Sequence, residues 1–141
     1  VLAVSADSIA FVDADDNVSK KESVADFVGA MAGSGLVAAS GVLSTRMDVT
    51  TAADADYNAA FGLNMSTANY TTPRTVTLPT ANAADAGRML IIKARNAGTH
   101  TLSISRNGSD VIEGTLTSLS IESDSGAVTL LCAGAGNWII V

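Results

Sequence analysis

The acidic stretch FVDADDNVSKKE, residues 11–22, holds the densest group of potential metal ligands in the sequence. Four of its side chains carry the carboxylate or amide oxygens that Ca²⁺ prefers: Asp13, Asp15, Asp16 and Asn17. If Asp13 began an EF-hand loop, its sixth position should be Gly and its twelfth Glu. Val18 and Val24 stand there instead, so the EF-hand is excluded, while an irregular calcium site on the same carboxylates stays open as the alternative. We expect a turn without a bound divalent ion, because acidic and turn-forming side chains are favoured ahead of a helix.

Catalytic chemistry is sparse in the rest of the chain. His100 is the single histidine, and it lies in an expected strand without an acid at a diagnostic spacing. Asp110 and Glu113 flank an expected hairpin, and two carboxylates three residues apart are common in turns. A glycosidase pair is recognised by the distance between its two carboxyl groups in space, which the sequence does not give. No GxSxG, HExxH or P-loop pattern occurs. Cys132 lies in the apolar segment AVTLLCAG, where a lone cysteine is typically a small buried hydrophobe. The sequence therefore predicts a non-enzymatic protein without cofactor or metal.

Charge and hydropathy narrow the range of partners. Charged residues make up 16% of the 141, against roughly 25% in soluble proteins, which favours packed β structure and subunit interfaces. Residues 1–60 hold nine acids and three bases, which gives the whole net charge of −6, while residues 61–141 hold five of each. A chain this acidic lacks the basic patch that binds the phosphate backbone of nucleic acids. We therefore expect no nucleic-acid partner. No apolar run reaches the roughly 18 residues that span a membrane.

One amphipathic helix is expected at about residues 20–32. Ser19 with Glu22 three positions later matches the capping-box pattern, and Gly33 is a natural stop. Behind this cap, an apolar stripe follows helical spacing: Val24, Phe27, Val28 and Met31. A helix of this length with a single stripe is marginal alone and needs another surface. We therefore take these four residues as a candidate assembly interface.

The remainder of the chain predicts β structure. Residues 33–46 are rich in Gly, Ser and Ala and predict a flexible or extended link. Residues 47–74 predict one or two strands, and short alternating segments follow at spacings of roughly 8–12 residues. Asn107-Gly108 is a strong hairpin signal. We expect a mainly β fold: an N-terminal arm with one short amphipathic helix (1–46), then an antiparallel β-sandwich or jelly-roll-like module (47–141).

Two aromatic residues are candidates for contact with a ligand or a partner. Trp138 lies in the terminal strand, where a core or interface role is commoner, and Tyr70 lies in the Thr-rich segment that precedes the regular strands. Carbohydrate sites commonly expose aromatic rings, and this chain has few of them. An adhesin interpretation therefore depends mainly on these two side chains.

Two segments resemble structural proteins of tailed bacteriophages. Residues 7–44, with a short strand, an acidic turn, KKESVAD and a Gly/Ser tail, resemble a segment that recurs in such virion proteins. Residues 75–141 resemble a β module of phage tail fibres and related appendages through TVTLP, AADAG, IIK, IEG and the closing WIIV. The resemblance implies a non-enzymatic virion protein, often trimeric, in a fibre, appendage or capsid-decoration role. Its partners would be its own copies and other capsid or tail proteins.

Two classes of function follow. The first is a homotrimeric structural protein of the virion, in which the arm docks or trimerises. The alternative is a receptor- or glycan-binding β-sandwich module whose partner is the host surface.

Overall fold

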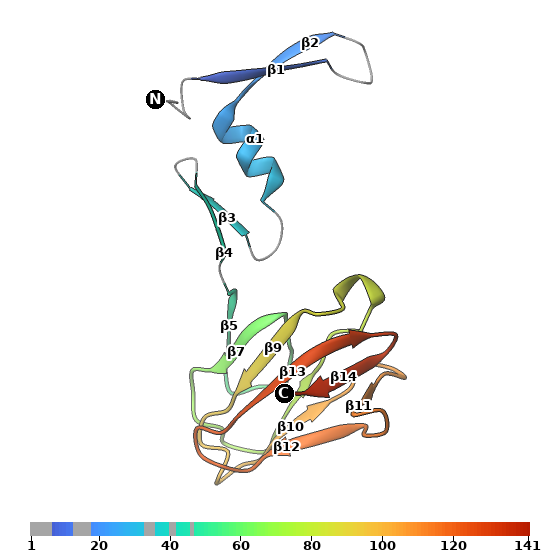
Figure 1. The fold of residues 1–141 in the computed structure, drawn as a ribbon. Coiled ribbons are helices and arrows are strands. Elements are labelled where there is room, and N and C mark those ends of the chain that lie inside the picture. The colour runs from blue at the N-terminus through green and yellow to red at the C-terminus, as the bar shows by residue number, and fades with distance from the viewer. Residues whose placement is uncertain (1–6, 13–17, 33–35, 40–41, 46) are drawn as a thin grey trace. The chain divides into compact units, whose positions relative to one another are not determined.

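The computed structural model describes residues 7–12, 18–32, 36–39, 42–45 and 47–141 (Figure 1). The chain divides into two compact units, Val1–Met47 and Asp48–Val141, next to the boundary expected from the sequence. Strands cover 47% of the residues and helical segments 9%, which confirms the mainly β class.

In its described residues, the first unit has two antiparallel strand pairs and one helix. Strands β1 (Ser8–Val12) and β2 (Ser19–Ser23) pair antiparallel, with Ser8 opposite Ser23. Helix α1 (Val24–Met31) follows β2 directly, and the Val24 amide donates to the Asp7 carbonyl at 3.2 Å. Strands β3 (Leu36–Ala39) and β4 (Val42–Thr45) form the second hairpin. The strand expected at 7–12 is confirmed.

The start of the helix differs from the expected capping box. Ser19 lies in β2 rather than at a helix N-terminus. The N-cap is Ser23, whose Oγ accepts from the Asp26 amide at 3.0 Å and donates to its carboxylate at 2.6 Å. The sequence carries two such signals in succession, and pairing with β1 takes the first into a strand. The helix is therefore one turn shorter than the expected 20–32.

The Gly/Ser/Ala segment at 33–46 is also not the connector that its composition indicated. β3 and β4 are paired from Leu36 opposite Thr45 to Ala39 opposite Val42. Small side chains do not prevent a backbone ladder, because the hydrogen bonds of a hairpin come from the main chain. The expectation of a link is wrong for the described part of this segment.

The strands of the second unit form two sheets. They are β5 (Val49–Ala52), β6 (Tyr57–Asn58), β7 (Gly62–Ser66), β8 (Arg74–Thr77), β9 (Met89–Lys93), β10 (Leu102–Ser105), β11 (Val111–Ile112), β12 (Ser118–Ile121), β13 (Ala127–Gly134) and β14 (Asn137–Ile140). The four-stranded sheet has the order β12-β10-β8-β6, and the six-stranded sheet has the order β11-β14-β13-β9-β7-β5. A short 3₁₀ helix, η1 (Ala83–Asp85), precedes β9.

From β5 to β10 the chain coils, because successive strands alternate between the two sheets. Strands β5, β7 and β9 are parallel neighbours in one sheet, and β6, β8 and β10 are parallel neighbours in the other. The expected antiparallel pairing is wrong between these strands and between β11 and β14. It holds for the pairs β10–β12, β9–β13 and β13–β14. Adjacent turns of the coil approach closely at Gly62, which has φ +106°, and a Cβ there would overlap the Asp48 carbonyl oxygen.

The hairpin expected at Asn107-Gly108 is a turn of another kind. The Asp110 amide donates to the Asn107 carbonyl at 3.0 Å, and Gly108 has φ +50°, so the chain does reverse here. However, β10 before the turn belongs to the four-stranded sheet and β11 after it to the six-stranded sheet. The local signal for a turn is confirmed, and the predicted pairing of its flanking strands is wrong.

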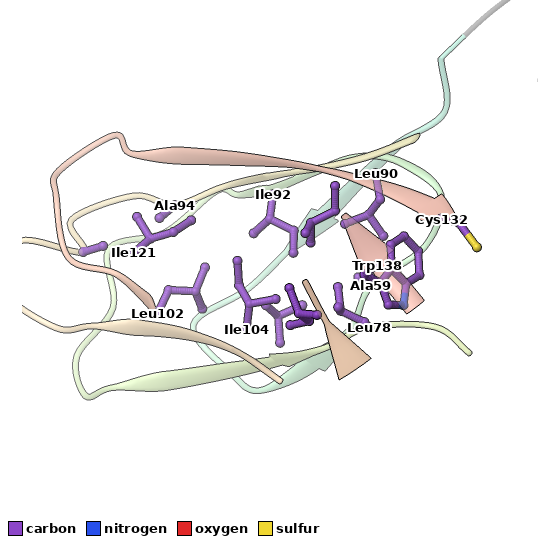
Figure 2. Packing of buried hydrophobic residues seen from close by; sticks show 14 of the residues in the cluster. Ala59, Leu78, Leu90, Ile92, Ala94, Leu102, Ile104, Ile121, Cys132 and Trp138 are labelled. Atoms are coloured by element: carbon purple, nitrogen blue, oxygen red, sulfur yellow. The ribbon is translucent and has the colours of Figure 1, made fainter. Parts of the chain in front are cut away.

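One hydrophobic core receives side chains from both sheets (Figure 2). Leu102 and Ile104 share a buried face in β10, as their alternation predicted, and both are fully buried. The largest fully buried side chains come from both sheets and the adjoining loops: Trp138, Tyr70, Leu78, Leu90, Ile92, Leu102, Ile104, Ile112 and Leu130. Period-2 patterning therefore locates the core in strands such as β10, whereas β7 buries Asn64 and Ser66 and turns Leu63 and Met65 outward.

We expect Ile104→Ala to destabilise the second unit by roughly 2–5 kcal/mol, because it leaves a cavity between the sheets. Ser103→Ala, one position along the same strand and facing outward, should change stability by less than about 1 kcal/mol. Urea unfolding followed by fluorescence of Trp138, the single tryptophan, measures both. Equal losses in the two variants would contradict the assignment of the inward face.

Candidate functional site

The candidate assembly interface on α1 changes in exposure along its length. Val24 is buried within its unit at 7% exposure, and Val28 is half-buried. Phe27 is 36% exposed and Met31 is 55% exposed. The Ser23 cap fixes where the helix begins and so places all four on one side at i, i+3, i+4 and i+7. The structure thus uses Val24 to anchor the helix and leaves the larger side chains substantially accessible.

Trp138 and Tyr70, the two candidate contact residues, lie in the core. Trp138 is fully buried, and its ring is 5.7 Å from that of Phe61 between centroids. The Arg88 guanidinium in turn lies 3.9 Å from the Phe61 ring centroid, a cation–π contact. Tyr70 is 2% exposed. Neither residue presents an open aromatic face to a ligand.

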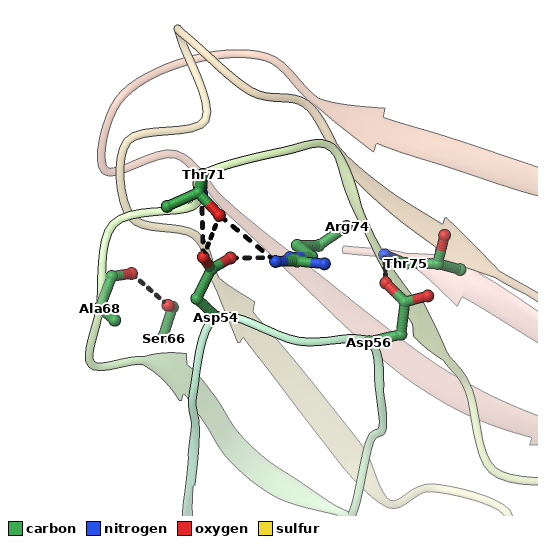
Figure 3. Close-up of polar contacts among 7 residues, drawn as sticks. All are labelled: Asp54, Asp56, Ser66, Ala68, Thr71, Arg74 and Thr75. Atoms are coloured by element: carbon green, nitrogen blue, oxygen red, sulfur yellow. Dashed lines mark hydrogen bonds and ion pairs between the residues drawn. The ribbon is translucent and has the colours of Figure 1, made fainter.

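A polar network that sequence reasoning missed joins the β5–β6 loop to the loop before β8 (Figure 3). The Asp54 carboxylate accepts from Arg74 Nε at 2.7 Å, from the Thr71 hydroxyl at 2.5 Å and from the Thr71 amide at 3.1 Å. Asp56 accepts from the Thr75 amide at 2.8 Å. The only signal in the sequence was the pattern Asp-Ala-Asp just before Tyr57. The residues that bond to these two carboxylates lie about 20 positions further along the chain, so the pattern alone does not identify them. These carboxylates hold one turn of the coil against the next.

The network sets the protonation of its acid. The hydrogen bonds from Arg74 and then from Thr71 hold the pKa of the Asp54 carboxyl well below its ordinary value of 3.8. The adjacent phenols respond to burial instead, which raises the pKa of Tyr57 to about 12. Asp85 behaves like Asp54: the hydrogen bond from Arg88, then that from Asn82, lowers its pKa. Asp54 and Asp85 are therefore arranged to stay ionised and bonded.

Other polar side chains also bind backbone rather than a ligand. Asp110 is buried, and its carboxylate accepts from the Ala81 amide at 2.8 Å. Glu113 accepts from the Ile140 amide at 2.6 Å. Buried Asn64 accepts from the Ala60 amide at 2.9 Å and donates to the Ala60 carbonyl at 2.7 Å. Each of these groups satisfies main-chain atoms where the coil turns.

The remaining predicted positions have simple structural places. His100 lies in the turn before β10 rather than in a strand, and its amide donates to the Asn96 carbonyl at 3.3 Å. Cys132 is fully buried with a free thiol, which confirms the small-hydrophobe interpretation. The acidic loop of Asp13, Asp15, Asp16 and Asn17 lies outside the described residues, so the absence of an ion there stays a prediction.

Among the residues that the structure describes, no three His, Cys, Asp or Glu side chains gather so that they could hold a metal ion. Likewise, no helix in the described ranges is long and apolar enough to cross a bilayer. No family model matches the chain, and no curated protein matches it significantly.

We expect Asp54→Asn to lower the thermal stability of the second unit at neutral pH, because the substitution removes the ion pair with Arg74. Since the pKa of the folded Asp54 carboxyl is below its ordinary 3.8, the contribution is full above about pH 5 and is lost as pH falls through and below 3.8. The difference in melting temperature between wild type and variant should therefore shrink in acid. Melting followed by Trp138 fluorescence across the pH range measures it.

The matched control is Glu122→Gln, which neutralises an exposed carboxylate in the turn after β12. Surface charges of this kind contribute little, so this variant should melt near the wild-type temperature at neutral pH. A constant difference for Asp54→Asn at all pH values would contradict the proposed role of its charge.

Proposed function

We propose that this chain is a non-enzymatic structural protein that assembles as a homo-oligomer, a trimer, on a tailed-phage particle. The observation that carries the proposal is the exposed part of the α1 stripe. Phe27 and Met31 are large apolar side chains on a short helix, and both keep a third or more of their surface accessible. Exposed apolar groups arranged in this way favour burial against another surface.

The organisation of the chain supports the same proposal. A β module with its own core follows a first unit of hairpins and one helix, which fits a sandwich carried by an assembly arm. The carboxylates of Asp56, Asp110 and Glu113 bind backbone amides, as in an architectural protein. The sequence resemblance to fibre, appendage and capsid-decoration proteins supports the particle as its location. Other capsid or tail proteins are the further partners that this role requires.

The adhesin alternative gains no specific observation. Glycan recognition commonly uses an exposed aromatic platform, and the two aromatic candidates, Trp138 and Tyr70, are buried. Assembly is therefore the function that we propose.

The decisive substitution is Phe27→Ala. Burial of a Phe side chain contributes roughly 1.5–3 kcal/mol, so its loss from a subunit contact should weaken association by about tenfold or more. The second unit should unfold as in wild type, because its core is built from its own strands. Sedimentation equilibrium of the full chain measures association, and Trp138 fluorescence follows unfolding.

Gly29→Ala is a matched control on the opposite side of the helix. A Cβ at Gly29 has no heavy atom within 4 Å, and Ala stabilises a helix relative to Gly by about 0.5–1 kcal/mol. This variant should associate at least as well as wild type. A wild-type chain that stays monomeric at all concentrations would contradict the proposal, as would a Phe27→Ala variant with unchanged association.

A further inference from the structure

The outward side of the six-stranded sheet is largely apolar, with Thr51, Thr129 and Lys93 as the polar members of its rows. In β9, Leu90 and Ile92 are fully buried, so Met89 and Ile91 point away from the core. The register places the outward residues in rows that cross the sheet, with Val49 next to Leu63 and Leu63 next to Ile91. A second row runs through Met89, Leu131 and Ile139. We call the set the outer apolar face: Val49, Leu63, Met89, Ile91, Leu131 and Ile139.

The outward side of the four-stranded sheet has the opposite character. Between its buried positions, the register aligns Thr75 with Ser103 and Ser120, and Thr77 with Ser105 and Ser118. This hydroxyl surface is suited to water. A strand that is apolar on both sides is typical of a sheet covered on both faces, whereas a strand with alternating polarity has one solvated face. The two sheets of one unit thus indicate that only the six-stranded sheet is covered on its outer side.

Nothing within residues 48–141 supplies that cover. Every strand of this fully described unit belongs to one of the two sheets, and the four-stranded sheet packs on the inward side. Met89 is 47% exposed and Val49 is 57% exposed. The strands β7, β9 and β13 lie side by side without a further layer of the unit over them (Figure 1).

The charges indicate what the cover is. A chain of net charge −6 repels its own copies, but the rows of the outer apolar face and the row beside them contain no acid. Their one charged side chain is Lys93, whose ammonium is bonded to the Ser125 carbonyl. A copy of the same face is apolar and carries no acid, so the same face of several copies can pack together without placing like negative charges in the contact.

The size of the face limits the strength of that contact. Five neighbouring strands at about 4.8 Å spacing give it an area of roughly 400–500 Å², about half of the ~800 Å² per partner in a stable interface. A single contact through this face is therefore weak. It becomes effective when other contacts of the same oligomer, such as those of the α1 stripe, add to it.

We propose that the outer apolar face is a self-association surface, covered in the assembled protein by the same face of further copies of this chain. The inference rests on the proposed homo-oligomer and names a second surface that holds it together. Association of the chain through this face excludes water from Ile91 at its centre, so a charge introduced there is desolvated in the oligomer and hydrated in the monomer.

The test compares Ile91→Glu with Ser103→Glu in the full chain. Both positions lie near the middle of a central strand, both are half-buried and outward, and both variants gain the same charge. Ile91→Glu should weaken association by about tenfold or more, and Ser103→Glu should leave it unchanged. Sedimentation equilibrium over a wide concentration range gives the constants, and circular dichroism with Trp138 fluorescence shows whether each variant is folded.

Ile91→Thr decides the question if the glutamate variant does not fold, because Thr is β-branched and suits a strand. It should weaken association in the same direction, by less. Wild-type association in a folded Ile91 variant would overturn the inference, as would an equal loss in Ser103→Glu. A loss confined to Phe27→Ala would keep the proposed function and remove this face from it, whereas a monomeric wild type would remove both.

Discussion

The shared core of two sheets is the constraint on which the rest of the second unit depends. Val76 and Ile104 from one sheet and Leu90 and Leu130 from the other are fully buried in the same cluster. Neither sheet could bury its inward side chains alone, and apolar burial is the dominant favourable contribution to folding. Because the chain supplies the two sheets alternately from β5 to β10, each strand is stabilised by segments that precede and follow it.

Coiling between two sheets creates many crossing loops, and these loops explain how the acidic side chains are used. A loop that leaves one sheet for the other has main-chain amides without a ladder partner. Asp54 and Asp110 each accept a hydrogen bond from such a loop amide in another segment. Asp56 and Glu113 accept from amides of the strands β8 and β14. Residues that could have served as acids, bases or ligands thus serve as connections between turns of the coil.

The outward surfaces of the two sheets differ in polarity. Ser and Thr hydroxyls cover one sheet, while Val, Leu, Ile and Met side chains cover the other. Exposed apolar surface is present in both units, on α1 and on the six-stranded sheet. Assembly through both places would combine contacts that are individually small, and combined contacts of this kind strengthen one another through effective concentration. The low charge content of the chain is consistent with extensive contact between neutral surfaces.

The sequence by itself determined where most strands lie, which side of β10 is inward, and that Cys132 is buried, because alternation of apolar residues is a local property of the chain. In β7 the tertiary structure decided otherwise, since Asn64 and Ser66 are buried there and Leu63 and Met65 face outward. It also located the α1 stripe, but placed its cap at Ser19 instead of Ser23. Tertiary structure alone decided which strands pair and in which direction, since a period of two is the same in parallel and antiparallel ladders. It likewise decided that Asn107-Gly108 turns between sheets and that Asp54 meets Arg74. These outcomes depend on how segments distant in sequence pack around the core, and local sequence patterns do not determine that packing.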